Sequence, residues 1–221
     1  VEGEGKGGVN APVDYWPDRC RLAGLVPDDA FVSLNDGLPW ERRDSLPRDE
    51  VYFNDTPATY TYGKPEHARI YRPLTDWHPV VLRIRRTLET KLGCDLDVCF
   101  LNRYLGPRDY LGWHADDSPE MDPERPIVTV SLGVERDIQF RPKPYEFERF
   151  RVESGALAGD GVVREAGPRG EPVPVETLTL ANGSAAVMRP GMQQAWQHRI
   201  PKSSRSDIGA RISLTFRGYV A

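Results

Sequence analysis

Hydrophobic and polar positions alternate along the chain with two different periods, and these periods predict its elements. Between Trp77 and Leu92 apolar residues fall every three or four positions, with arginines between them. Gly93 follows as a stop signal, so this segment is expected to be an amphipathic helix. A shorter helix is expected between Leu25 and Trp40, ending near Gly37.

Much of the remaining chain consists of short apolar or β-branched runs separated by glycine and proline. Such runs predict the strands of an antiparallel sandwich or open barrel, so the expected fold class is mainly β with flanking helices. The expected strands are Val51–Phe53, Ala58–Tyr62, Val98–Leu101, Ile127–Leu132, Ile138–Phe140, Val175–Leu180, Ala185–Met188 and Ile212–Phe216.

Composition favours a single domain over residues 1–221. Of the 221 residues, 39% are hydrophobic and 28% are charged, which is typical of a soluble globular domain with its own core. The glycine-rich residues 1–10 are expected to form a flexible tail. Residues 141–174, rich in glycine, proline and charge, are expected to form a long excursion between strands.

Charge and cysteine content narrow the function classes only slightly. The net charge of −4 argues against a protein that coats nucleic acid by electrostatics alone, although five basic residues and one acid lie between Arg199 and Arg217. Three cysteines give neither a disulfide framework nor a zinc signature. No apolar run is long enough to cross a bilayer and no leader pattern opens the sequence. We therefore expect a monomer without a membrane partner, cytoplasmic or, in a eukaryote, nuclear.

Candidate metal ligands occur in two distant segments. On a strand, residues two apart share a face, so His114 and Asp116 can converge on one ion. His198 supplies a second imidazole far downstream. Two imidazoles and one carboxylate on one side of a metal leave positions open, as in non-haem iron(II) oxygenases. The other histidines, His67 and His78, lack such context and are expected to be surface or structural residues.

Polar residues on two further strands suit a carboxylate ligand. The last expected strand alternates cleanly, which places Arg211, Ser213 and Arg217 on one face. Either this is an edge strand with a solvated polar face, or its two guanidinium groups bind a dicarboxylate. Asn102 and Tyr104 also share a face, where they offer an amide and a phenol, unless they only lead the strand into a turn.

Taken in order, Asn-x-Tyr, His-x-Asp, a downstream histidine and two arginines six positions apart resemble the AlkB family of iron(II)- and 2-oxoglutarate-dependent dioxygenases, in its nucleic-acid-repair branch. The resemblance covers the chain from about Pro47 onward and includes residues around the ligands. The matching segments are Tyr60-Thr61-Tyr62-Gly63, Trp77-His78-Pro79-Val80, Asn102-Arg103-Tyr104, Gly112-Trp113-His114-Ala115-Asp116-Asp117 and Arg211–Arg217.

The resemblance implies a double-stranded β-helix, a cupin-like jelly-roll, over residues 98–217, with an N-terminal nucleotide-recognition lid over residues 38–75. It implies that His114, Asp116 and His198 are the catalytic residues that hold iron(II). The residues implied to bind 2-oxoglutarate are Tyr104, Arg211 and Ser213 at its distal carboxylate, and Asn102 and Arg217 at the end that chelates the metal.

The implied reaction removes an N-alkyl group oxidatively from a base such as 1-methyladenine or 3-methylcytosine in DNA or RNA. It consumes O2 and 2-oxoglutarate and releases succinate, CO2 and an aldehyde. The base must leave its stack, so stacking and phosphate-binding side chains are expected at the pocket mouth. The expected substrate contacts are Tyr60, Tyr62, Trp113, Asp117, Arg136 and Arg141, with Arg48 and Lys64 as candidate phosphate contacts. For the three aromatics a place in the core is the alternative, and for Arg48 and Lys64 a solvated surface position.

One position departs from the family. Ser118 stands where the branch usually carries an acid facing the cationic base, although Asp117 or Glu120 could compensate. Three alternatives therefore stay open: the same type of oxygenase acting on a protein, a modified base or a small molecule; a catalytically inactive nucleic-acid-binding module; and a zinc hydrolase. The complete set of candidate metal ligands argues against a catalytically inactive module. A zinc hydrolase would leave Arg211 and Arg217 without a role.

Overall fold

The computed structural model describes residues 5–6, 11–44, 46–62, 68–143, 163–166 and 172–220. Its strands are β1 (Gly5–Lys6), β2 (Val13–Trp16), β3 (Glu41–Arg42), β4 (Asp49–Asn54), β5 (Tyr60–Tyr62), β6 (Arg69–Tyr71), β7 (Val98–Tyr104), β8 (Leu111–His114), β9 (Ile127–Gly133), β10 (Arg136–Pro142), β11 (Val163–Ala166), β12 (Pro172–Leu180), β13 (Ala185–Met188), β14 (Trp196–Ile200) and β15 (Arg211–Arg217). Its helices are α1 (Arg19–Leu22), α2 (Pro27–Gly37), α3 (Pro79–Leu92) and α5 (Met192–Ala195). None of these helices is long and apolar enough to span a membrane.

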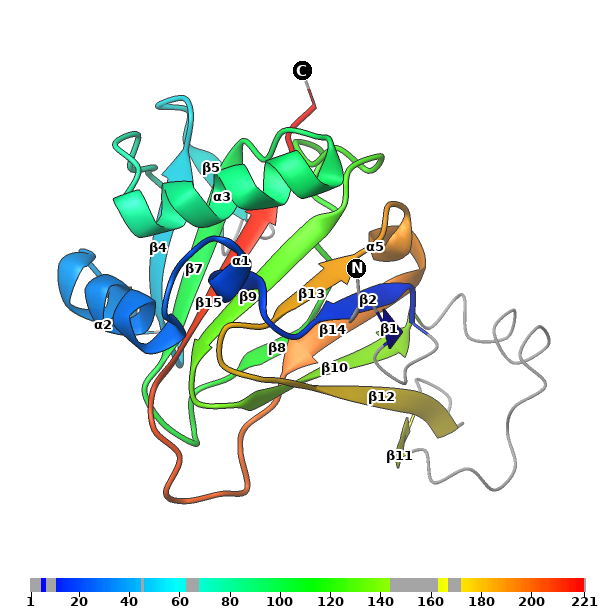
Figure 1. Cartoon of the computed structure of the whole chain (residues 1–221). Coiled ribbons are helices and arrows are strands. Elements are labelled where there is room, and N and C mark those ends of the chain that lie inside the picture. The colour runs from blue at the N-terminus through cyan, green and yellow to red at the C-terminus, as the bar shows by residue number, and fades with distance from the viewer. Residues whose placement is uncertain are drawn as a thin grey trace.

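Two antiparallel sheets form the body of the described chain (Figure 1). The larger has the strand order β1-β2-β13-β9-β15-β7-β4-β3, and the smaller has the order β11-β12-β10-β14-β8. One buried cluster joins Tyr104 and Met188 of the larger sheet to Phe140 and Trp196 of the smaller, so the two sheets pack face to face. These packed antiparallel sheets confirm the mainly β fold class expected from the strand pattern, and they fit the jelly-roll that the resemblance implies.

Helices α2 and α3 cover the outer face of the larger sheet (Figure 1), where their apolar residues share a second cluster with the sheet. Helix α3 begins at Pro79 rather than at Trp77, because proline suits a first turn and the His78 side chain caps it, with Nδ1 accepting from the Val80 amide. The helix ends at Gly93, which has a φ of 70°. His78 is therefore structural, as predicted.

Strand β15 lies inside the larger sheet, between β9 and β7. All seven of its residues are buried, so the edge-strand interpretation of its alternation is wrong. Ile212, Leu214 and Phe216 pack toward the helices, and Arg211 lies opposite Tyr104 on the face between the sheets. The alternating pattern thus separates a helix-facing apolar row from a buried polar row.

The structure shortens three of the expected segments. Within residues 1–10, expected as a flexible tail, Gly5–Lys6 pairs with β2 as β1, and the others lie outside the described residues. Within the expected lid, β3 and β4 belong to the larger sheet and only the β5–β6 hairpin stands apart. In the expected excursion, β10 extends to Pro142, β12 begins at Pro172, and β11 pairs with β12 between them. Lys64 and His67 lie outside the described residues.

Candidate metal centre and binding cavity

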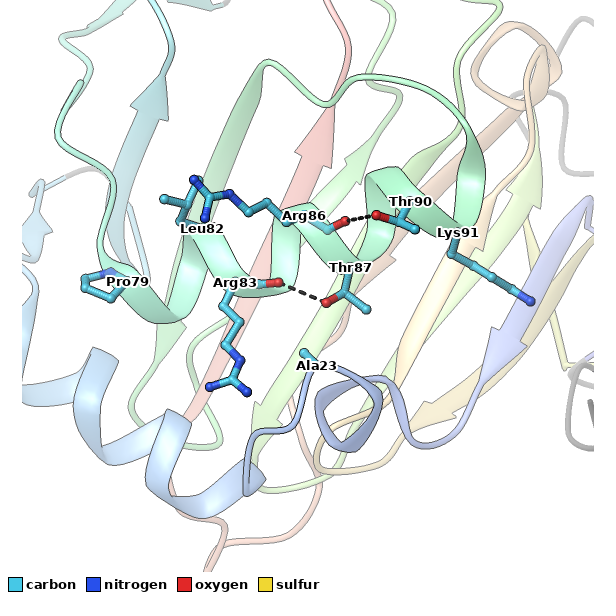
Figure 2. A pocket seen from close by; sticks show the side chains of 8 residues that line it. All are labelled: Ala23, Pro79, Leu82, Arg83, Arg86, Thr87, Thr90 and Lys91. Carbon is cyan, nitrogen blue, oxygen red and sulfur yellow. Dashed lines mark hydrogen bonds between the residues drawn. The ribbon is translucent and has the colours of Figure 1, made fainter.

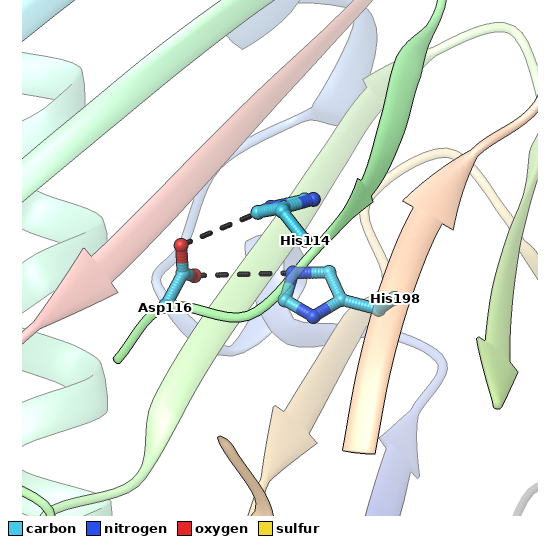
Figure 3. A group of neighbouring side chains, drawn as sticks. All are labelled: His114, Asp116 and His198. Atoms are coloured by element: carbon cyan, nitrogen blue, oxygen red, sulfur yellow. Dashed lines mark ion pairs between the residues drawn. The ribbon is translucent and has the colours of Figure 1, made fainter. Parts of the chain in front are cut away.

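The pairing of β14 with β8 places His198 directly opposite His114, with ring centroids 4.2 Å apart. Asp116 lies two residues beyond the end of β8, in non-strand backbone, and not on the strand itself as the sequence suggested. Its carboxylate nevertheless turns toward both rings (Figure 3), with Oδ1 3.8 Å from Nε2 of His114 and Oδ2 3.8 Å from Nε2 of His198. The candidate ligand atoms of the three residues lie within 4.8 Å of one another.

The charge states of this triad suit a divalent metal. Burial lowers the pKa of His198 to about 3 and also lowers the pKa of His114, so both imidazoles are neutral at pH 7. Nδ1 of His114 lies 2.9 Å from the Gly112 carbonyl oxygen and donates a hydrogen bond to it. The unprotonated nitrogen is then Nε2, whose lone pair is available to a metal on the side of Asp116. Burial alone would raise the pKa of Asp116, but Arg217 and the two imidazoles outweigh it and keep this carboxyl ionised.

Arg211 is a fully buried cation with unused donors. Its Nε donates to Ser131 Oγ at 2.8 Å, whereas Nη1 and Nη2 have no hydrogen-bond acceptor among the described residues. The buried Tyr104 hydroxyl likewise has no hydrogen-bond partner among the described residues. Burial lowers the pKa of Arg211 to about 10, so the guanidinium is still charged at pH 7. Buried donors left unpaired are costly, and a carboxylate placed here would satisfy them.

Ser213 lies between Arg211 and Arg217 on the same face of β15, 3% exposed and opposite Asn102. Arg217 Nη2 donates to Asp116 Oδ2 at 2.7 Å, and its buried Nε has no partner in the described chain. Guanidinium nitrogens without a hydrogen-bond acceptor among the described residues thus lie at both ends of this face of β15, on Arg211 and on Arg217. A dicarboxylate that also reaches the metal could bind to both.

The candidate phosphate contact Arg48 is instead 6% exposed. Its Nε donates to Asn102 Oδ1 at 2.7 Å and its Nη2 to Glu50 Oε1 at 2.7 Å. The surface interpretation of Arg48 is therefore wrong, whereas its role as a phosphate contact stays a prediction. Because Asn102 already accepts through its oxygen, its amide NH2 group is the part left to donate to a carboxylate.

A cavity of about 320 Å3 opens onto the metal centre and includes His114, Asp116 and Arg217 in its lining. Tyr60, Tyr62 and Tyr71 of the β5–β6 hairpin and Trp113 of β8 form aromatic parts of its wall. Of the predicted substrate contacts, the three aromatics Tyr60, Tyr62 and Trp113 are thus placed beside the metal centre. The Tyr60 hydroxyl lies 2.6 Å from Ser118 Oγ, so Ser118 contacts this wall without carrying a charge.

The structure places the other predicted substrate contacts elsewhere. Asp117 is exposed, accepts from Lys143 Nζ at 2.8 Å, and lines a neighbouring cavity of about 300 Å3. Arg136 is 3% exposed and donates to the backbone carbonyls of Gly106, Asp109 and Pro201, so it holds loops together. Neither residue lines the cavity at the metal centre.

Arg141 contacts the cavity wall through the ring of Trp113. Its guanidinium carbon lies 4.4 Å from the centroid of the Trp113 ring, and that of Arg199 lies 4.5 Å from the same centroid. Gln197 also accepts from Arg141, at 3.1 Å. These contacts orient Trp113 through cation–π attraction.

A larger hollow, of about 710 Å3, lies over the outer face of α3 and is lined partly by Arg83, Arg86 and Lys91 (Figure 2). The Thr87 and Thr90 hydroxyls beside these residues donate to carbonyl oxygens of the helix itself. None of the candidate metal or carboxylate ligands lines this hollow, so the chemistry belongs to the smaller cavity.

The model of the 2OG-Fe(II) oxygenase superfamily matches residues 37–217. The chain belongs to this superfamily. Alpha-ketoglutarate-dependent dioxygenase alkB homolog 3 from Bos taurus is 29% identical over 205 residues, which are 90% of this chain and 65% of the relative. DNA oxidative demethylase ALKBH2 from Arabidopsis thaliana is 32% identical over 200 residues, 85% of this chain and 60% of the relative.

These similarities confirm the resemblance of this superfamily member to AlkB proteins, although the chain spans less than two thirds of the length of either relative. A solved structure of OsALKBH1 matches with a TM-score of 0.56 at 10% identity, covering 95% of this chain and 98% of the other. That likeness concerns the fold alone, and it agrees with the jelly-roll described above.

Iron(II) and 2-oxoglutarate, which the superfamily's name identifies, both fit the residues of this site. The triad of His114, Asp116 and His198 offers two neutral nitrogens and a carboxylate, and the unsatisfied Arg211 suits a carboxylate. Glu50 and Tyr71 also line the cavity, and neither was among the residues predicted for it. The available signal for one buried polar face was the pair of charged residues Arg48 and Glu50, which stand at alternate positions before and within β4.

Proposed function

We propose that this chain removes N-alkyl groups oxidatively from nucleobases in DNA or RNA. The observation that carries the proposal is the aromatic-walled cavity that includes the metal-binding residues His114 and Asp116. An N-alkylated base is a flat ring, and aromatic side chains such as Tyr62 and Trp113 offer it stacking surfaces.

Each part of the site has a defined task in this reaction. Bound iron(II), with O2 and 2-oxoglutarate, supplies the oxidising chemistry. His114, Asp116 and His198 hold the metal, while Arg217 keeps the Asp116 carboxylate ionised and oriented. Arg211 binds the distal carboxylate of the cosubstrate, and the aromatic wall positions the alkyl group and excludes water.

The decisive test is mass spectrometry of oligonucleotides that carry 1-methyladenine or 3-methylcytosine, single- and double-stranded, after incubation with protein, iron(II), 2-oxoglutarate and ascorbate. We expect loss of the methyl group that requires both iron and 2-oxoglutarate. Retention of the methyl group while 2-oxoglutarate is still converted to succinate would contradict the substrate assignment and leave the oxygenase in place.

One observation favours a second candidate, the same oxygenase chemistry on a different substrate. Position 118 carries an uncharged serine bound to Tyr60, and the nearby Asp117 faces Lys143 outside the cavity. A cationic base would lack the acid expected at that position. The oligonucleotide panel separates the two candidates directly.

A further inference from the structure

Glu50 is a buried acid that the proposed chemistry has not used. It is the second residue of β4, is 4% exposed, and lines the cavity at the metal centre. Its Oε1 accepts from Arg48 at 2.7 Å. Its Oε2 is buried and has no hydrogen-bond partner within 3.5 Å among the described residues. The Tyr71 hydroxyl, which also lines the cavity, faces this carboxylate, and burial together with Glu50 raises the pKa of that hydroxyl.

Other buried acids nearby are fully engaged. Asp49 binds Arg42 through Oδ1 and Arg103 through Oδ2. Both oxygens of Asp116 face the imidazoles, and Oδ2 also binds Arg217. Across the described chain, Glu50 is the acidic side chain with a buried oxygen left unpaired. Because buried polar atoms are almost always paired in folded proteins, the free Oε2 indicates a partner that arrives with a ligand.

The surroundings of Glu50 define that ligand. Glu50 lies opposite Asn102 in the β4–β7 pair, so it sits between the aromatic wall and the expected site for the cosubstrate. Among the residues that line the cavity, Glu50 and Asp116 are the acids, and Asp116 belongs to the metal triad. Ser118, bound to Tyr60, offers no charge. A planar ligand would fit the aromatic wall, and an N–H donor on that ligand would pair with the free oxygen of Glu50.

We propose that Glu50 is the specificity-determining residue of the cavity, whose carboxylate accepts a hydrogen bond from the exocyclic amino group of an N-alkylated adenine or cytosine. This inference rests on the proposed function and names the bases within it. A base with a carbonyl at the same position brings a lone pair toward the carboxylate and is disfavoured. The positive charge of 3-methylcytosine or 1-methyladenine adds attraction in a poorly solvated site.

The paired probes are oligonucleotides containing 3-methylcytosine or 3-methyluracil. At one ring position the cationic 3-methylcytosine has an amino group, whereas the neutral 3-methyluracil has a carbonyl. Binding is measured by fluorescence anisotropy without O2, with manganese(II) and 2-oxoglutarate present, and turnover is measured by mass spectrometry with iron(II). The proteins are the wild type, Glu50→Gln, and Glu135→Gln as a control with the same chemical change at an exposed position away from the cavity.

We expect the wild type to favour 3-methylcytosine over 3-methyluracil in binding and in turnover. Glu50→Gln should lower that ratio at least tenfold, because an amide can donate to a carbonyl, whereas Glu135→Gln should leave the ratio unchanged. An unchanged ratio in Glu50→Gln would overturn the proposal. A wild type without preference between the two bases would overturn it as well, even if Glu50→Gln fails to fold. Selective binding of 3-methylcytosine without methyl loss would support the role of Glu50 and count against the proposed dealkylation.

Discussion

Arg211 carries a full positive charge into the space between two sheets, where its side chain is 0% exposed. A buried guanidinium with two unpaired nitrogens destabilises the folded protein unless an anion joins it. Asp116 shows the opposite arrangement, since Arg217 and two imidazoles already surround its carboxylate. Arg211 is therefore a cationic site that needs the negative charge of a ligand. Asp116, in contrast, is an ionised carboxylate that is ready to bind a metal cation.

Asp116→Ala is expected to abolish iron-dependent turnover while the protein stays folded. The substitution removes one of three candidate metal ligands and leaves Arg217 without its carboxylate partner. Succinate formation from 2-oxoglutarate is the measurement, with the thermal unfolding midpoint as a check on folding. The exposed Asp207→Ala is the matched control and should retain activity. Full activity of Asp116→Ala would show that the metal assignment is wrong.

At the scale of elements, helix α3 supports the site without touching it. Its buried residues Val81, Ile84 and Leu88 pack on the outer face of the larger sheet, and β15 presents Arg211 and Arg217 from the opposite face. The helix is well marked in the sequence because its period, its capping histidine and its terminal glycine are all local signals. Packing of this helix holds β15 in place and thereby holds the cosubstrate site.

Leu88→Ala should destabilise the protein by about 2–5 kcal/mol, the range for cavities created in well-packed cores. Leu88 is 1% exposed and lies within the cluster between α3 and the sheet. Urea unfolding followed by circular dichroism measures the change. Leu105→Ala, at a residue that is 49% exposed, makes the same chemical change and should cost much less. Equal losses in the two variants would contradict the packing described here.

At the scale of the whole molecule, the site joins the two sheets. The imidazoles come from β8 and β14 of the smaller sheet, and the arginines come from β15 of the larger sheet. A metal and a dicarboxylate bound together would therefore cross-connect the halves of the jelly-roll. Ligands that bind the folded state alone raise its stability by mass action.

Manganese(II) and 2-oxoglutarate together should raise the thermal unfolding midpoint more than manganese(II) alone. At a 2-oxoglutarate concentration one hundred times its dissociation constant, the added stability is about 2.7 kcal/mol. Arg211→Lys should lose most of the 2-oxoglutarate increment and keep the manganese increment, since lysine lacks the guanidinium fork. Differential scanning fluorimetry measures both, with the exposed Arg205→Lys as control. A normal 2-oxoglutarate increment in Arg211→Lys would contradict the assigned role.

The sequence by itself determined two short-range features of this protein, because strand alternation identified the polar face of β15 and helical periodicity identified α3. Both depend on spacing along the chain, which the sequence states directly. The grouping of His114 and Asp116 with the distant His198 came from the order of motifs that resembles AlkB proteins. The tertiary structure alone decided which charges neutralise one another.

Arg48 and Arg136 were expected at the surface or the substrate, yet each is buried against partners distant in the sequence, among them Asn102 and Pro201. The free oxygen of Glu50 was equally invisible, because it depends on which donors the fold leaves out of reach. The sequence gives the sign of a charged residue and, on a strand, the face on which it lies. Whether burial leaves it paired, or ready for a ligand, depends on the register of strands that only the folded chain brings together.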